Sequence, residues 1–238
     1  RGLSKIFHDG LDDPPSWSVP HWRPKTSHGQ YADPANQAIR DKQAQLAKQL
    51  TAEKAAKAPA GATVAPVKLG GPPTECADVP DTAYADGLTA EKALEALREA
   101  AGANQPFFLA VGLYRPHLPF VAPSRFYDLY PLNSIPLPQN PPDDLADIPA
   151  ASKAVRPHLW NNMQMDAPRI KEALRGYYAS TSFMDDQLGR VMAGLERMGL
   201  ASNTVIVFWG DHGWHLGEHT RWQKMSLMEE SAHVPLII

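Results

Sequence analysis

The sequence predicts an α/β protein with a mainly parallel central sheet flanked by helices. A continuous apolar run at residues 107–112 is typical of a parallel strand covered on both faces. A long amphipathic pattern over residues 168–198 predicts a helix, and a second apolar run follows it at 204–209. A polar loop comes directly after each apolar run. This order of helix, turn, strand and loop is typical of parallel α/β sheets.

The first part of the chain is predicted to contain loops and two helices. Residues 1–34 are rich in Pro, Trp, His and Asp, which favours a loop region. Residues 35–60 favour a helix because Ala, Gln, Lys and Leu dominate. Low-complexity Ala/Pro/Gly sequence follows to about Pro80 and is expected to be mobile, and we expect residues 40–80 to form a low-complexity insertion. Thr89 is a good N-cap for a second helix that ends near Ala101.

The later elements frame a polar loop. Residues 116–149 are rich in proline, which predicts an extended excursion over the surface. The helix at 168–198 should end at Gly199, and the run at 204–209 is predicted to be a buried strand. Ligands of parallel α/β sheets bind where the strands end at their carboxyl edge, and this rule points to the loop that contains Asp211.

Composition narrows the classes of function. With 23 Lys and Arg against 26 Asp and Glu, the net charge of −3 predicts no nucleic-acid partner. The longest apolar stretch, 106–114, is far below the ~20 residues that span a bilayer, so we expect no membrane contact. The single cysteine, Cys76, excludes an internal disulfide and a multi-thiolate zinc site. Because the chain starts at Arg1 and ends inside an apolar run, we expect it to be part of a longer protein.

The segment 211–219 carries the strongest chemical signal. It holds three His, one Asp and one Glu in nine residues. Asp211 and His212 emerge together after the strand, and a hard oxygen ligand beside a nitrogen ligand suits a divalent cation. The alternative is a hydrogen-bonded turn without metal. The pattern lacks His-Glu-x-x-His and any Cys ligand, so it favours Ca²⁺, or with less support Mg²⁺, over zinc.

Cationic side chains accompany this pair. Lys224 lies a few residues further along, where its ammonium group could meet an anion held over the metal. The alternative interpretation is that Lys224 is a solvated surface lysine. His117 follows the apolar run 107–112 and so occupies the end of another strand. Lys5 and His8 form a Lys/His pair near the start of the chain. A metal, ammonium groups and imidazoles together suit the stabilisation of an anionic leaving group such as a sulfate or phosphate ester oxygen. No Gly-x-Ser-x-Gly elbow or Walker loop supplies a nucleophile.

Two long motifs resemble a known family. The segments FFLAVGLYRPHLPF (107–120) and FWGDHGWHLGEH (208–219), with Lys224 and the ending HVPLI (233–237), are similar to type I sulfatases, in the branch of iduronate-2-sulfatase and its bacterial relatives. The resemblance runs from Ser4 to the end of the chain. It implies an alkaline-phosphatase-like α/β fold, a single catalytic domain truncated at both ends, and hydrolysis of sulfate esters at a Ca²⁺ centre. The nucleophile would be a formylglycine made from a Cys/Ser-x-Pro-x-Arg segment.

The resemblance also implies roles for particular residues. Asp211 and His212 resemble metal ligands of the family. Lys5 and His8 resemble the Lys and His near the nucleophile and the bound sulfate. Trp214 is similar to an aromatic residue that lines the substrate pocket.

The remaining correspondences and departures bear on catalysis. His117 and Lys224 resemble the pair that contacts sulfate. The formylglycine segment and two further Asp ligands of the family lie upstream of the Lys-x-x-His motif, outside this chain, so we expect the chain alone to be inactive. Pro123-Ser-Arg125 is no substitute because Val121 stands at the nucleophile position. Gly210 also stands where relatives often have Ser.

Partners and alternatives follow from the same resemblance. We expect a sulfated small molecule or saccharide as substrate, with loops such as 12–34 and 131–166 setting specificity, and relatives are exported or lysosomal. Two alternatives stay open: a phosphoester or phosphonate hydrolase of the same fold, and a non-catalytic sulfatase-like binding protein.

Overall fold

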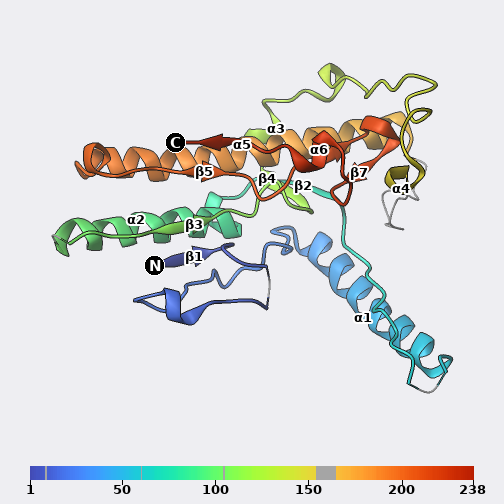
Figure 1. Ribbon diagram of the computed structural model, residues 1–238, viewed down its shortest axis with the longest axis horizontal. Coiled ribbons are helices and arrows are strands. Elements are labelled where there is room, and N and C mark those ends of the chain that lie inside the picture. Colours follow the sequence, from blue (N-terminus) through green and yellow to red (C-terminus); the bar gives the residue numbers. More distant parts are fainter. Residues whose placement is uncertain (9, 60, 104, 154–164) are drawn as a thin grey trace. The chain divides into compact units, whose positions relative to one another are not determined.

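The chain divides into two compact units. The computed structural model describes residues 1–8, 10–59, 61–103, 105–153 and 165–238 (Figure 1). Unit 1 comprises Arg1–Tyr130 and Gly176–Gly199, and unit 2 comprises Pro131–Arg175 and Leu200–Ile238. That both units belong to one catalytic domain stays a prediction.

Unit 1 contains the parallel strands and the long helices. Its elements are β1 (Gly2–Ser4), η1 (Pro14–Ser16), α1 (Pro34–Ala56), β2 (Thr74–Ala77), η2 (Asp81–Ala83), α2 (Ala85–Ala103), β3 (Ala110–Gly112), β4 (Phe120–Pro123), α3 (Ser124–Tyr127) and most of α5 (Ala167–Arg197). Strand β1 pairs in parallel with β3, with Ser4 opposite Gly112, and β2 pairs in parallel with β4. The carboxyl ends of β1 and β3 therefore lie side by side.

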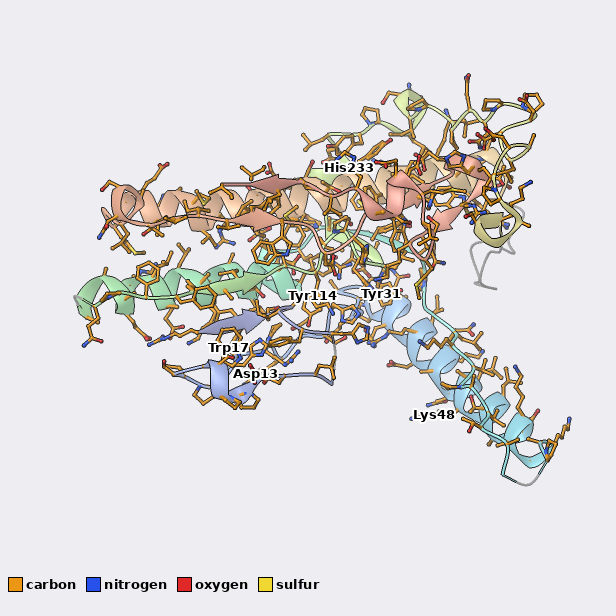
Figure 2. All side chains as sticks on the ribbon, in the orientation of Figure 1. Asp13, Trp17, Tyr31, Lys48, Tyr114 and His233 are labelled. Carbon is orange, nitrogen blue, oxygen red and sulfur yellow. The ribbon has the colours of Figure 1, made fainter. Side chains whose placement is uncertain are left out.

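The core of unit 1 joins these strands to α2 and α5. Phe183 of α5 packs with Tyr84 and Phe126 in a hydrophobic cluster. The cluster also contains Tyr31, Tyr127, Ala179, and Val121 and Ala122 of β4. A second cluster places Leu3 of β1 against buried alanines of α2. Burial raises the pKa of Tyr31 (Figure 2) to about 12, so its hydroxyl stays a donor at neutral pH.

A buried carboxylate ties the start of α1 to β2. Glu75 accepts hydrogen bonds from the backbone N–H groups of Ala32 and Asp33, at 2.7 and 3.1 Å. It also accepts from Asn36 Nδ2 and from the hydroxyl of Tyr84, at 3.0 and 2.8 Å. Four donors offset the cost of burying this carboxylate.

Two of the predicted helices are confirmed with small changes at their ends. Helix α1 occupies Pro34–Ala56, where 35–60 was expected, and Asp33 caps it by accepting from Ala35 N–H. Helix α5 occupies Ala167–Arg197, where 168–198 was expected. Gly199 follows it with φ of 68°, the left-handed conformation that a glycine readily adopts after a helix.

The predicted N-cap of the second helix is wrong. Helix α2 begins at Ala85, and Thr89 lies buried inside it, where its hydroxyl donates to Ala85 O at 2.8 Å. The earlier start reflects tertiary packing. A Cβ at Gly87 would lie 2.1 Å from Asp81 O, so only glycine permits this close approach to η2.

The proline-rich stretch 116–149 was expected at the surface, but it begins with a buried strand. Phe120, Val121 and Ala122 of β4 are fully buried because β4 pairs with β2. Strand β2 itself lies inside the expected insertion 40–80, which also contains most of α1. The mobility of that insertion stays a prediction.

The loop after β3 is clamped by two buried residues of opposite charge, each of which binds backbone groups. Asp86 of α2 accepts the backbone N–H groups of Tyr114 and Arg115, both at 2.8 Å. The buried guanidinium of Arg115 donates to the carbonyls of His28, His117 and Pro119. Desolvation raises the pKa of Asp86 and lowers that of Arg115, and the opposite charge of each partner counteracts the shift.

Unit 2 contains short elements joined by turns. They are η3 (Leu132–Ser134), α4 (Ala150–Lys153), the first residues of α5, η4 (Ala201–Asn203), β5 (Phe208–Trp209), β6 (His215–Leu216), η5 (Glu218–Thr220), β7 (Trp222–Gln223), α6 (Glu229–Ala232) and β8 (Leu236–Ile237). In the part of unit 2 that the structure describes, β5 pairs with β8 and β6 with β7, and both pairings are antiparallel.

The apolar runs are less buried than expected. Strand β5 covers only the end of 204–209, and Val205 and Trp209 are 82% and 63% exposed. Strand β3 begins at Ala110, after an exposed Phe108. Among the described residues, β3 and β5 each pair with one other strand. Neither is the central strand, covered on both faces, that its apolar run predicts. No helix within the described ranges combines the length and hydropathy needed to cross a membrane.

The clamp gives the first testable prediction. Asp86→Ala should lower the free energy of unfolding by about 2–4 kcal/mol, because it leaves two backbone N–H groups without their acceptor and removes a negative charge that acts on the buried Arg115. Urea unfolding followed by circular dichroism measures this. The control, Asp128→Ala, removes an exposed carboxylate in the same unit and should change stability by less than about 0.5 kcal/mol. Equal effects of both substitutions would contradict the clamp.

Candidate functional site

Unit 2 brings three of the expected site residues together. Asp211 and His212 lie in the turn between β5 and β6. Asp211 Oδ1 is 3.8 Å from His212 Nε2, and Lys224 Nζ is 2.6 Å from the same nitrogen. A carboxylate, an imidazole and an ammonium group therefore meet at one point.

The imidazole of His212 is oriented by its other nitrogen. His212 Nδ1 lies 2.8 Å from Gly213 O, a carbonyl that can only accept, so Nδ1 carries the proton. Nε2 then presents its lone pair toward Lys224 and Asp211. This is the tautomer that a metal ligand requires.

The β6–β7 hairpin delivers Lys224 to this point. His215 pairs with Gln223, and Lys224 is the first residue after β7. The residues on both sides of it, Gln223 and Met225, have φ of 81° and 82°. Non-glycine residues in the left-handed region cost about 1–3 kcal/mol each and persist only where the surroundings hold them. The backbone at Lys224 is strained on both sides.

A close approach holds the turn that carries the pair. Gly213 N donates to Ser231 O at 2.9 Å, and a Cβ at Gly213 would lie 2.0 Å from Glu230 O. Only glycine can sit so near the backbone of α6. Trp214 follows as a half-buried residue, directly before β6.

Unit 1 holds the other expected residues at neighbouring strand ends. Lys5 follows β1, its N–H donates to Gly112 O at 3.2 Å, and its ammonium group contacts Phe7 O at 3.4 Å. His117 follows β3 and is half-buried. His8 is exposed in the turn that follows Lys5.

His117 lies beside two aromatic residues that sequence reasoning missed as a group. The ring of His28 meets that of His117 edge-on, with centroids 5.0 Å apart. His28 also stacks on Tyr114 (Figure 2) at 4.8 Å, with 14° between the planes. His28 comes from the loop 12–34, which was singled out for specificity, but no spacing in the sequence connects it to His117. Residues 154–164 of the other specificity loop lie outside the described ranges.

The pair Asp211 and His212 fits part of a divalent-cation site. An ion with ligands at about 2.3–2.6 Å can contact two donors that are 3.8 Å apart. Asp211 is exposed, so its oxygens remain accessible to an ion. Within the described ranges no three or more His, Cys, Asp or Glu residues are arranged to hold a metal, and Ca²⁺ takes 6–8 ligands. The pair would therefore be part of a larger ligand set.

The fold defines the class of protein. Parallel strands flanked by helices, with polar side chains in the loops that follow the strands, are typical of α/β proteins that bind ligands at the carboxyl ends of their strands. The fold is alkaline-phosphatase-like, and solved structures of that architecture resemble it. The match to a phosphonate monoester hydrolase from Agrobacterium radiobacter covers 93% of this chain and 43% of the hydrolase chain, with a TM-score of 0.57 and 21% sequence identity.

Sequence comparison gives the family. The profile of the Sulfatase family matches residues 22–238, so the chain belongs to the sulfatase family. Human iduronate 2-sulfatase is 31% identical over 99% of this chain and 42% of its own length. The phosphonate monoester hydrolase SpPMH from Silicibacter pomeroyi is 26% identical over 67% of this chain and 33% of its own, with a TM-score of 0.54. The chain spans less than half the length of these relatives.

The glycine at position 213 gives the second prediction. Gly213→Ala should destabilise unit 2 by about 1–3 kcal/mol, because the added methyl group would overlap Glu230 O. Thermal unfolding measures the loss. Gly210→Ala is the matched control, since a Cβ there would first meet Val234 Cβ at an ordinary 3.5 Å. A loss at both positions, or at neither, would contradict the described packing.

Proposed function

We propose that the protein is a divalent-cation-dependent sulfatase that hydrolyses sulfate esters of sugars or related alcohols. The observation that carries the proposal is the convergence of Asp211, His212 and Lys224. Membership of the sulfatase family supports it. Ca²⁺ is the metal we favour, because a carboxylate leads the site and no thiolate is near it.

Each residue of this group has a distinct task. Asp211 and His212 would hold one side of the cation, and a bound cation would withdraw charge from a sulfate oxygen. Lys224 would place its ammonium group on the sulfate and stabilise negative charge there. Because Lys224 now contacts His212 Nε2, its ammonium group must leave that nitrogen when a cation binds.

The roles we propose for residues of unit 1 rest on membership of the sulfatase family. His117 would contact the sulfate and help the alcohol leave, and Lys5 and His8 would act near the nucleophile. His8 is our candidate base for the step that releases sulfate. The nucleophile, which we expect to be a formylglycine, and further Asp ligands would come from residues outside this chain.

The substrate class follows from the relatives. Human iduronate 2-sulfatase supports a sulfated saccharide, with Trp214 lining the pocket for the sugar. A second candidate function is hydrolysis of phosphonate monoesters, which the likeness to SpPMH supports. Both esters present a tetrahedral anion to the same cations.

The third prediction separates the two activities. The protein expressed from its complete gene, supplied with Ca²⁺ and a formylglycine-generating system, should hydrolyse 4-nitrophenyl sulfate at least about tenfold faster than phenyl phosphonate monoesters. Release of 4-nitrophenol and of phenol is followed in parallel. The reverse preference would favour the second candidate, and saturable sulfate binding without turnover would favour a binding protein.

The fourth prediction concerns competition between Lys224 and the metal. Lys224→Ala should raise KM for the sulfate ester while it tightens Ca²⁺ binding by roughly tenfold, because the ammonium group no longer opposes a cation at His212. Calorimetric titration with Ca²⁺ measures the affinity without substrate. Lys153→Ala, in the same unit, is the control. Weaker Ca²⁺ binding in Lys224→Ala would contradict the proposed arrangement.

A further inference from the structure

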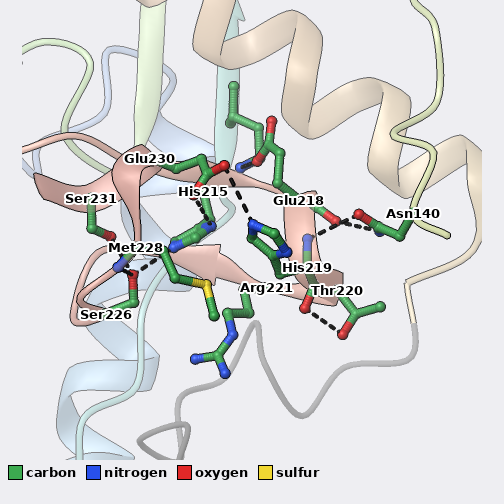
Figure 3. A network of polar contacts seen from close by, with 12 residues as sticks. Asn140, His215, Glu218, His219, Thr220, Arg221, Ser226, Met228, Glu230 and Ser231 are labelled. Carbon is green, nitrogen blue, oxygen red and sulfur yellow. Dashed lines mark hydrogen bonds and ion pairs between the residues drawn. The ribbon is translucent and has the colours of Figure 1, made fainter. Parts of the chain in front are cut away.

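The segment 211–219 contains histidines that the proposed function does not use. His215 is the most buried of them, with 1% of its side chain exposed, and it lies in β6, directly opposite Gln223. Figure 3 shows it within a polar network that continues through Ser226 and Glu230. Burial lowers the pKa of His215 below its ordinary value.

The strained turn around Lys224 needs an anchor on its far side. Gln223 and Met225 hold positive φ angles, and Gln223 is fixed by its pairing in the hairpin. The chain leaves β7 after Gln223, and among the described residues no strand pairing restrains Lys224 or Met225. The next residue, Ser226, is where the network of Figure 3 begins.

The hydrogen bonds of Ser226 define the direction of its contact with His215. Ser226 Oγ donates its proton to Ser231 Oγ at 3.0 Å and accepts from Met228 N–H at 3.3 Å. His215 Nε2, 2.7 Å from Ser226 Oγ, is therefore the donor in their contact. The bond closes a loop from β6 to the residue after the strained turn.

Glu230 lies behind this imidazole. Its Oε2 is 3.9 Å from His215 Nδ1, and its Oε1 is 3.5 Å from His219 Nε2. His219 is held in turn by Asp144, at 2.9 Å from Nδ1. A carboxylate and, beyond it, a second imidazole therefore lie on the Nδ1 side of His215.

We propose that His215 is a positioning residue for Lys224: its hydrogen bond to Ser226 holds the strained turn at Gln223–Met225 and so fixes the backbone from which the ammonium group reaches the anion of the substrate. The inference rests on the proposed function in assigning Lys224 to the anion of the substrate. Loss of the bond lets the turn relax toward ordinary backbone angles, which moves Lys224 while Asp211 and His212 stay in place.

The test uses the protein expressed from its complete gene. His215→Ala should raise KM for 4-nitrophenyl sulfate by roughly tenfold, the effect of losing one buried hydrogen bond, with a smaller change in kcat. His215→Gln, whose amide can still donate to Ser226, should recover most of the loss. His233→Ala is the matched control, since that histidine is 79% exposed and pairs only with Glu229 among the ion pairs of the described residues (Figure 2).

A double-mutant cycle decides whether the effect passes through Lys224. In a Lys224→Ala background, His215→Ala should leave KM unchanged, because the ammonium group it positions is already gone. Thermal unfolding of every variant shows that the proteins are folded. The inference would be overturned if the effects of His215→Ala and Lys224→Ala on KM multiplied in the double variant. It would also be overturned if His215→Gln folded but did not recover KM.

Failure of the proposed function would be visible separately. If the wild type hydrolyses no sulfate ester, the same cycle is measured as binding of inorganic sulfate by calorimetry. Binding that weakens in His215→Ala, but not further in the double variant, would sustain the positioning role without the activity. No sulfate binding by a folded wild type would overturn both.

Discussion

The contact between Lys224 and His212 is the interaction that joins the candidate site residues of unit 2. Lys224 Nζ lies 2.6 Å from His212 Nε2. This imidazole nitrogen therefore faces a positive charge whether or not a metal is present. The contact links two segments that are separated along the chain by the whole β6–β7 hairpin. Its geometry is set by strand pairing on one side and by a strained turn on the other.

The sequence predicted those parts of the fold that depend on local pattern. Helix α5 was recognised because its apolar residues repeat at helical spacing over 31 residues, and α1 because good helix formers continue without interruption. Thr89 was misread because the true start of α2 depends on the approach of Gly87 to Asp81, which no local pattern records. Strand β4 was missed for a similar reason, since its partner β2 lies in a stretch that reads as low complexity.

The same distinction applies to the candidate site. Asp211, His212 and Lys224 could be found because they lie close along the chain, in a motif that follows an apolar run. The clamp formed by Asp86 and Arg115 could not, because its two members belong to a helix and a distant loop and meet only through tertiary packing. His28 is a further example. Its place beside His117 depends on a hydrogen bond from the Arg115 guanidinium to the His28 carbonyl, and the sequence does not reveal this bond.

The buried carboxylate of Glu75 has a practical consequence for α1. It secures the first turn of the helix through backbone donors, whereas further along α1 Ala47 is the one buried residue. The end of the helix thus carries little of the packing energy of unit 1. An affinity tag or fluorescent domain inserted at Lys57 would sit at the end of α1, whereas Glu75 holds the start of this helix. The turn at Lys57 is therefore a suitable attachment point for purifying or imaging the protein.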